Sequence, residues 1–334
     1  CRAACEALAS ETADGGPALL IGLPWVEDGK LYNACAVLDQ GRIEAVRFKV
    51  DLPNYSVFDE KRVFVSGPMP GPVNLRGLRI GLPICEDIWG PDVVETLAET
   101  GAEILLVPNG SPYFRGKFDV RLNIAAARVT ESRLPLVYLN QIGGQDELVF
   151  DGASFVLNAD SSLACQMESF KQSIVITEWS RGPQGWSCAS ASKALPLDDD
   201  KADYAACVLG FKDYVEKNRF PGVVLGLSGG IDSALCAAMA VDALGADRVH
   251  AVMLPYHYTS SESLEDAQAC AKALGIRYDV IPIASAVGGF ESALTSLFKG
   301  TNRDITEENL QSRTRGTILM AISNKFGAMV MTTG

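Results

Sequence analysis

One short segment constrains the fold of this chain more than any other. Residues 223–244 read VVLGLSGGIDSALCAAMAVDAL, which is an apolar run, a tight Ser-Gly-Gly loop and then a stretch with helical spacing. A loop of this kind, rich in backbone N–H groups, is typical of anion binding where a parallel strand gives way to a helix. The segment therefore predicts an α/β domain with a parallel sheet and a phosphate-binding loop.

The pattern of apolar runs predicts two domains. Over residues 203–334, helical stretches alternate with short apolar strands, which predicts a doubly wound parallel sheet. Over residues 1–179, strands come in pairs with helices between them, which predicts a layered α/β sandwich. Residues 180–202 are rich in Ser, Ala, Gly and Pro and end in an acidic run, so we expect a linker there.

Composition narrows the class of protein. The chain has 334 residues, a net charge of −12 and 48% hydrophobic residues. The acidic balance argues against a nucleic-acid surface, and no apolar run approaches the ~20 residues of a membrane helix. Nine cysteines without a CxxC pair favour reduced thiols inside a cell. We therefore expect a cytoplasmic protein that binds small molecules, with no nucleic-acid or membrane partner.

Both ends of the sequence suggest a part of a longer protein. The chain begins in an amphipathic stretch, CRAACEALAS, without an initiator Met. It stops at AMVMTTG, just after a strand-like run, and natural domains seldom end at the edge of a strand. We therefore expect further segments before Cys1 and after Gly334.

The loop at 226–233 carries the residue types that a nucleotide phosphate needs. Its paired glycines let the backbone approach a ligand, and its two serines add hydroxyl groups. Asp232 would repel a phosphate unless a divalent cation bridges the two. The lysine-bearing GxxxxGK[ST] loop is absent. The simpler interpretation of the segment is a tight turn that caps a helix.

This loop resembles the pyrophosphate-binding loop of the ATP pyrophosphatases. Downstream, LPYHYTSSESLEDAQACAKALG and DITEENLQSRTRG resemble the NAD synthetases, and the likeness runs over most of 203–334. The resemblance implies ATP as co-substrate, with Mg²⁺ on Asp232 and deamido-NAD⁺ on Asn309. Arg313 and Arg315 would contact phosphate, or else be solvated helix charges. The residues implied to bind ATP are Gly226, Leu227, Ser228, Gly229, Gly230, Ile231, Asp232, Ser233 and Thr333.

A second candidate site lies in the first domain. LRIGLPICEDIWGPDV (78–93) places Cys85 between a strand and a helix. A thiol at such a turn is presented for attack, and we expect the helix dipole to lower its pKa. Taken alone, the same cysteine could equally be a small buried hydrophobe.

The context of Cys85 favours a nucleophile. FKVDLPNYSVFDEKRVF (48–64) resembles the lysine motif of the nitrilase superfamily, as found in the glutaminase domain of glutamine-dependent NAD synthetases. That superfamily has an αββα sandwich and a Glu-Lys-Cys triad. The resemblance implies that Cys85 forms a thioester and that Lys49 stabilises the oxyanion. The implied glutamine contacts are Tyr55, Ser111 and Lys117.

Two questions about carboxylates stay open: the role of Glu60 and the identity of the general base. Glu60 is either a second supporting carboxylate or a surface charge in DEKR. No residue here fills the place of the general-base glutamate, because Glu6 and Glu11 lie in or just after the first helical stretch. We expect that base before Cys1. Cys1 itself could be an N-terminal nucleophile of another amidotransferase class, but it has no partner motif.

The resemblance implies a carbon–nitrogen ligase that works in two steps. Glutamine would be hydrolysed to ammonia, and deamido-NAD⁺, adenylated by ATP, would take up that ammonia to give NAD⁺, AMP and pyrophosphate. Homo-oligomerisation is implied by the family alone. The main alternative is a standalone nitrilase-type amidase with a degenerate, regulatory nucleotide module, against which the intact SGGIDS and EENLQ motifs argue. Another ATP-pyrophosphatase amidotransferase and a non-catalytic scaffold are the remaining alternatives.

Overall fold

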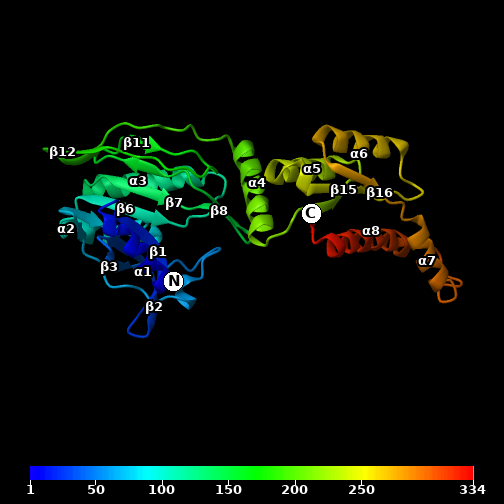
Figure 1. Cartoon of the computed structure of the whole chain (residues 1–334), viewed down its shortest axis with the longest axis horizontal. Helices are drawn as coiled ribbons and strands as arrows, with labels where there is room; N and C mark the ends of the chain where they lie inside the picture. Colours follow the sequence, from blue (N-terminus) through cyan, green and yellow to red (C-terminus); the bar gives the residue numbers. More distant parts are fainter. Residues whose placement is uncertain (334) are drawn as a thin grey trace. The chain divides into compact units, whose positions relative to one another are not determined.

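The computed structural model describes residues 1–333 and separates into two compact units (Figure 1). The first unit consists of Cys1–Gly143 and Val149–Asp203. The second consists of Gly144–Leu148 and the chain from Tyr204 onward. Each unit has its own sheets and its own apolar core, so each is described by itself.

Two sheets form the centre of the first unit. The smaller is antiparallel, in the order β1-β2-β3. The larger has six strands in the order β11-β10-β7-β6-β5-β4. The strands of these sheets are β1 (Leu19–Glu27), β2 (Lys30–Asp39), β3 (Arg42–Phe48), β4 (Val73–Leu75), β5 (Leu78–Gly81), β6 (Ile104–Asn109), β7 (Leu136–Asn140), β10 (Phe155–Leu157) and β11 (Leu163–Gln166).

Helices cover the outer faces of these two sheets, which makes four layers. Helix α1 (Arg2–Glu11) packs Cys5 and Ala9 on the outer face of β1–β3. Helices α2 (Asp92–Glu99) and α3 (Lys117–Ser132) cover the outer face of the larger sheet. Strand β6 shows the underlying period of two: Leu105 and Val107 face these helices, whereas Ile104 faces the other sheet. The predicted αββα sandwich is thus confirmed.

Two short hairpins contain the remaining strands that precede the parallel sheet of the second unit. They are β8 (Ile142–Gln145) with β9 (Leu148–Asp151), and β12 (Trp179–Gly182) with β13 (Gly185–Cys188). The second hairpin lies within the range predicted as a linker. Cys188 is buried there against Val156 and Cys165, and Lys193 forms a bridge with Gln166. Much of 180–202 is therefore ordered on the first unit, because its few apolar residues cover a sheet edge.

The second unit contains a parallel sheet in the order β16-β15-β14-β17. One face is covered by α4, α5 and α6 and the other by α7 and α8, so the sheet is doubly wound, as predicted. The elements are α4 (Asp199–Lys217), β14 (Val223–Gly226), α5 (Ile231–Leu244), β15 (Val249–Met253), α6 (Ser261–Leu274), β16 (Arg277–Val280), α7 (Ala284–Leu294), α8 (Ile305–Phe326) and β17 (Met329–Met331). Alternate residues of β14 face opposite sides: Leu225 faces α5, whereas Val224 faces α8. Within residues 1–333, no helix is both long and apolar enough to cross a membrane.

Candidate active sites

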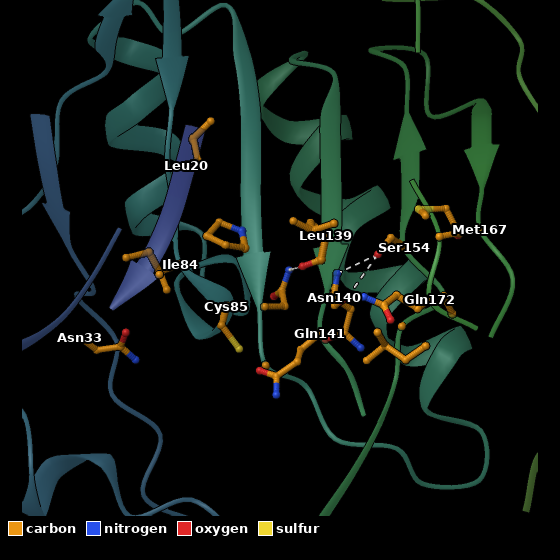
Figure 2. A pocket seen from close by; sticks show the side chains of 18 of the residues that line it. Leu20, Asn33, Ile84, Cys85, Leu139, Asn140, Gln141, Ser154, Met167 and Gln172 are labelled. Atoms are coloured by element: carbon orange, nitrogen blue, oxygen red, sulfur yellow. Dashed lines mark hydrogen bonds between the residues drawn. The ribbon is translucent and has the colours of Figure 1, made fainter. Parts of the chain in front are cut away.

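A cavity of about 590 Å³ opens between the two sheets of the first unit. Figure 2 shows residues that line it, with the side chain of Cys85 pointing into it. Three residues singled out from the sequence line this one cavity: Lys49, Glu60 and Cys85. Lys49 directly follows β3 in the smaller sheet, and Cys85 comes shortly after β5 in the larger one. The sandwich therefore brings two distant motifs to the same space.

The backbone of Cys85 is strained. Its φ is +48°, in the left-handed region that non-glycine residues rarely occupy. The residue begins a short 3₁₀ helix, η3 (Cys85–Ile88), and Cys85 contributes to the wall of the cavity. A conformation of this kind costs on the order of 1–3 kcal/mol and clusters at functional sites. The strained turn thus presents the thiol to the cavity at a cost in folding free energy.

The expected lowering of the Cys85 pKa by a helix dipole is wrong. The turn after Ile84 is only one 3₁₀ turn, and α2 begins further along the chain at Asp92, so Cys85 does not itself stand at the N-terminus of an α-helix. Burial raises the pKa of the Cys85 thiol above its ordinary value. The Lys49 ammonium and the backbone N–H of Gly110 act in the opposite direction with smaller effect.

Lys49 and Glu60 form a buried ion pair. Lys49 Nζ lies 2.7 Å from Glu60 Oε1, and the two side chains are only 1% and 17% exposed. Asn33 Nδ2 donates to the other oxygen of Glu60 at 3.4 Å. Of the two interpretations open for Glu60, the supporting carboxylate therefore agrees with this geometry, and the solvated surface charge does not.

The predicted glutamine contacts surround Cys85 but do not line its cavity. Tyr55 Oη donates to Glu86 Oε1 at 2.8 Å, and both residues line an adjacent cavity of about 560 Å³. Burial, followed by that hydrogen bond, raises the pKa of the Tyr55 phenol. The Lys117 ammonium lies over the rings of Trp89 and Phe114, 4.5 Å from each centroid. Burial lowers the pKa of Lys117, whereas the charge of Glu86 acts to raise it.

Ser111 belongs to a buried polar network. Its hydroxyl accepts a hydrogen bond from Arg121 Nε at 3.0 Å, and its carbonyl accepts from Arg121 Nη2 at 2.7 Å. Arg121 Nη1 also contacts both oxygens of Asp151, at 2.8 and 2.9 Å. Asn140 Oδ1 accepts from the backbone N–H of Ser111 at 2.9 Å. This network holds the loop that begins at Gly110, whose N–H interacts with the Cys85 sulfur.

Sequence reasoning missed four of these residues: Glu86, Asp87, Arg121 and Asp151. Asp87 is buried and accepts hydrogen bonds from three backbone N–H groups. The available signal for Asp87 and Glu86 was their position directly after Cys85. No such signal exists for Arg121 and Asp151. Arg121 lies on a helix and Asp151 at the end of a strand, and only the fold makes them neighbours.

The loop at 226–233 lies between β14 and α5, as predicted. Gly230 caps α5, and Gly229 has a φ of +83°. A Cβ on Gly229 would lie 2.4 Å from the backbone oxygen of Ser263, so the loop fits closely against α6. The hydroxyls of Ser228 and Ser233 lie 3.1 Å apart, and Ser233 Oγ donates to the Gly230 carbonyl. The buried Ser233 hydroxyl thus braces the loop, whereas Ser228 is exposed.

The other predicted residues of the second unit lie on α8 and after β17. Thr333 follows β17, which pairs in parallel with β14, so both strands end at the same sheet edge as the loop. Asn309 and Arg313 are exposed on α8. Arg315 Nε donates to the carbonyl of Leu254 at 3.1 Å, just beyond β15. That bond accounts for one Arg315 donor and leaves its other nitrogens for a ligand.

Comparisons with known proteins agree with the division into two units. The carbon-nitrogen hydrolase family model matches residues 3–182, and the NAD synthase family model matches residues 204–334. The first match covers more than half of the chain. The chain therefore belongs to the carbon-nitrogen hydrolase family, and its residues 204–334 are similar to the NAD synthase family.

Individual relatives show the same two-part likeness. A glutamine-dependent NAD(+) synthetase of Rhodobacter capsulatus is 53% identical over 99% of this chain and 60% of its own length. One from Xanthomonas campestris is 45% identical over 100% of this chain and 60% of its own length. A solved structure of the Acinetobacter baumannii enzyme in complex with ADP is 43% identical, with a TM-score of 0.93 over 100% of this chain and 63% of that one. The chain thus spans about 60% of the length of these curated relatives.

Proposed function

We propose that the first unit hydrolyses glutamine to ammonia through a thioester on Cys85. The observation that carries this proposal is the convergence of Cys85 with the Lys49–Glu60 pair in one cavity. A thiol nucleophile needs a partner that stabilises the oxyanion, and a buried ammonium is such a partner. Glu60 would hold the ammonium in place rather than act as the base, because its Oε1 is bonded to Lys49 Nζ.

The reaction would proceed by attack of Cys85 Sγ on the carboxamide carbon of glutamine. The thiol proton would pass to a carboxylate base, and Lys49 Nζ would donate to the oxyanion of the tetrahedral intermediate. When this intermediate collapses, the C–N bond breaks and the nitrogen leaves with that proton as ammonia. Water would then cleave the thioester to glutamate and restore the thiol. None of the described residues is assigned as the base.

Recognition of glutamine rather than a simple amide would come from the charges beside Cys85. Free glutamine carries an α-ammonium and an α-carboxylate. Glu86 and Lys117 supply one charge of each sign close to the sulfur, since both influence, or are influenced by, the charge on Cys85. Tyr55, bonded to Glu86, would fix the orientation of that carboxylate. Ser111 would contribute through its backbone, because its hydroxyl is already bonded to Arg121.

We further propose that the second unit uses ATP to adenylate deamido-NAD⁺ and then transfers ammonia to it, which gives NAD⁺. The loop at 226–233 supports this, because it leads into the N-terminus of α5, where an anion is favoured. The name of the R. capsulatus relative, glutamine-dependent NAD(+) synthetase, and the ADP in the A. baumannii structure support it too. The match of residues 204–334 to the NAD synthase family favours this proposal over the amidase alternative.

The chemistry of Asp232 fits a magnesium ion that is shared with the substrate. Its carboxylate is exposed at the start of α5, beside the loop. Among residues 1–333 no cluster of three potential metal ligands occurs, so phosphate oxygens and water would complete the coordination, as Mg²⁺ commonly requires. A bound Mg²⁺ would neutralise charge on the leaving pyrophosphate.

Covalent labelling tests the glutaminase proposal most simply. The intact protein is incubated with a diazoketone analogue of glutamine, digested, and analysed by mass spectrometry. We expect one adduct, on Cys85, that excess glutamine prevents. Cys207 is the internal control, because this exposed thiol should not react faster than a free cysteine. Labelling that ignores glutamine, or that falls mainly on another cysteine, would overturn the proposal.

A further inference from the structure

Asp87 has a buried carboxylate to which the reaction above gives no part. Its side chain is 1% exposed. Asp87 Oδ1 accepts hydrogen bonds from Val50 N at 3.0 Å and from Asp51 N at 2.8 Å. Asp87 Oδ2 accepts one from Ile84 N at 2.9 Å. Two of these amides directly follow the lysine of the site, and the third directly precedes its cysteine.

The two catalytic groups need such a link because they belong to different sheets. Lys49 follows β3, which is in the three-stranded sheet, whereas Cys85 follows β5, which is in the six-stranded sheet. Apolar side chains pack the two sheets together, and such packing has no preferred direction. Directional bonds are therefore required to fix the distance between the ammonium and the sulfur, and the carboxylate of Asp87 spans the two segments.

We propose that Asp87 is a positioning residue that sets the place of the Lys49 ammonium relative to the Cys85 thiol. The proposal rests on the glutaminase reaction proposed above and assigns Asp87 no contact with substrate. A carboxylate suits the role because both of its oxygens accept hydrogen bonds. An asparagine would turn an N–H donor toward one of the three backbone donors, which leaves a buried clash of donors.

The effect of the Lys49 charge on the alkylation of Cys85 can be measured, and a loss of folding stability alone would not change it. Lys49 attracts anions to the sulfur, so Cys85 should favour an anionic alkylating agent over a neutral one of the same size. The ratio of the rate constants with iodoacetate and iodoacetamide then reports the position of that charge, because changes in access affect both reagents alike. The other titratable groups close to the sulfur are Tyr55, Glu60, Glu86, Lys117 and Tyr138.

In the intact protein, we expect Asp87→Asn to lower this ratio at Cys85 about threefold, as a shift of the ammonium by roughly 1 Å would do. If the variant only removed the negative charge of Asp87 and Lys49 did not move, the ratio would rise. The sign of the change therefore distinguishes a shift of the ammonium from the loss of the Asp87 charge. The kcat for glutamine hydrolysis should fall about 10- to 100-fold, with a much smaller change in KM. Rates at the single peptide that carries Cys85 are followed by mass spectrometry, with Cys85→Ala as the blank.

Three further variants make the test specific. Asp51→Asn is the matched control, because it removes an exposed carboxylate nearby and keeps the backbone bonds to Asp87; its ratio should equal that of the wild type. Lys49→Met should lower the ratio by itself. If Asp87 acts through the lysine, Asp87→Asn should no longer lower the ratio in the Lys49→Met background, where only the loss of its own negative charge remains and acts to raise the ratio. A lowering of the ratio by Asp87→Asn that is equal in both backgrounds, or a raised ratio in the background that keeps Lys49, would overturn the proposal.

Unfolding of the variant would be recognised directly. In a folded first unit the buried thiols of Cys165 and Cys188 stay unreactive, whereas in an unfolded one they are alkylated. If Asp87→Asn unfolds, Asp87→Glu replaces it, because it keeps the charge while its extra methylene displaces the carboxylate; a wild-type ratio there would contradict the proposal. Absence of glutaminase activity in the wild type would defeat the proposed function alone, since the alkylation ratio is measured without glutamine.

Discussion

At the scale of single residues, the two candidate sites both depend on left-handed backbone. Cys85 has a φ of +48° and Gly229 a φ of +83°. The first is the proposed nucleophile, whose backbone is strained, and the second is a glycine, for which this conformation carries no strain. In each case the turn presents a group at the end of a strand: a thiol in the first unit, and backbone N–H groups in the second.

The pKa of Cys85 gives a prediction for the free protein. Because burial raises this pKa above its ordinary value, the thiol is protonated at neutral pH and the thiolate fraction increases as the pH rises. The rate of alkylation of Cys85 by iodoacetamide should therefore still be increasing at pH 9 in the absence of glutamine. A rate that is constant above pH 7 would show a low thiol pKa and contradict this environment.

Gly229 and Gly230 form a matched pair for a second prediction. Gly229→Ala would place a methyl group 2.4 Å from the backbone oxygen of Ser263, on a residue with positive φ. Gly230→Ala meets only the Ser228 hydroxyl, at 3.4 Å. We expect Gly229→Ala to weaken ATP binding, measured by calorimetry, by about 5- to 150-fold, from a loop strain of roughly 1–3 kcal/mol. Gly230→Ala should have a clearly smaller effect, and equal effects would contradict the described loop.

At the scale of elements, the glutaminase candidate depends on bonds that tie loops to helices and strands. Arg121 on α3 connects the loop at Ser111 with Asp151 at the end of β9. Both charged side chains are almost fully buried, at 1% and 5% exposure. Buried pairs of this kind add little net stability but are costly to break, because one charge is then left alone.

We therefore expect Asp151→Asn to destabilise the first unit by about 3–5 kcal/mol in denaturant unfolding. Glutamine hydrolysis should weaken as well, since the loop from Gly110 to Ser111 would lose its anchor. The control is Asp200→Asn, which breaks an ion pair of a 93% exposed carboxylate with Arg115 and should cost less than about 1 kcal/mol. Similar losses in both variants would show that the Arg121 network is not a special support.

The elements also show how far sequence reasoning reached. The paired apolar runs of residues 1–179 and the strand–helix alternation over residues 203–334 predicted both sheet systems correctly, because burial on two faces leaves a clear apolar pattern. The helix that follows the Cys85 motif begins at Asp92, and a single 3₁₀ turn, Cys85–Ile88, precedes it. The hairpin from Trp179 was missed, because short polar strands carry little periodicity.

At the scale of the whole molecule, sequence reasoning named the candidate reacting groups but not the residues that support them. Cys85, Lys49 and the 226–233 loop lie in local motifs, which a single sequence displays. Arg121 and Asp151 are 30 residues apart, and Asp87 bonds to Val50 and Asp51, which are more than 30 residues away. Such pairings arise only when the sheets pack, so the sequence gives no sign of which residues will be joined.

We propose that the two units carry two separate reactions that are linked by ammonia. The measurement that tests it most directly is NAD⁺ formation by the intact protein from deamido-NAD⁺, ATP and Mg²⁺, with either glutamine or ammonium as nitrogen donor. We predict that both donors support NAD⁺ formation in the wild type, and that Cys85→Ala loses at least about 10³-fold of the glutamine-dependent rate while it keeps the ammonium-dependent rate. Loss of both rates in Cys85→Ala, or no NAD⁺ from either donor in the wild type, would contradict the account.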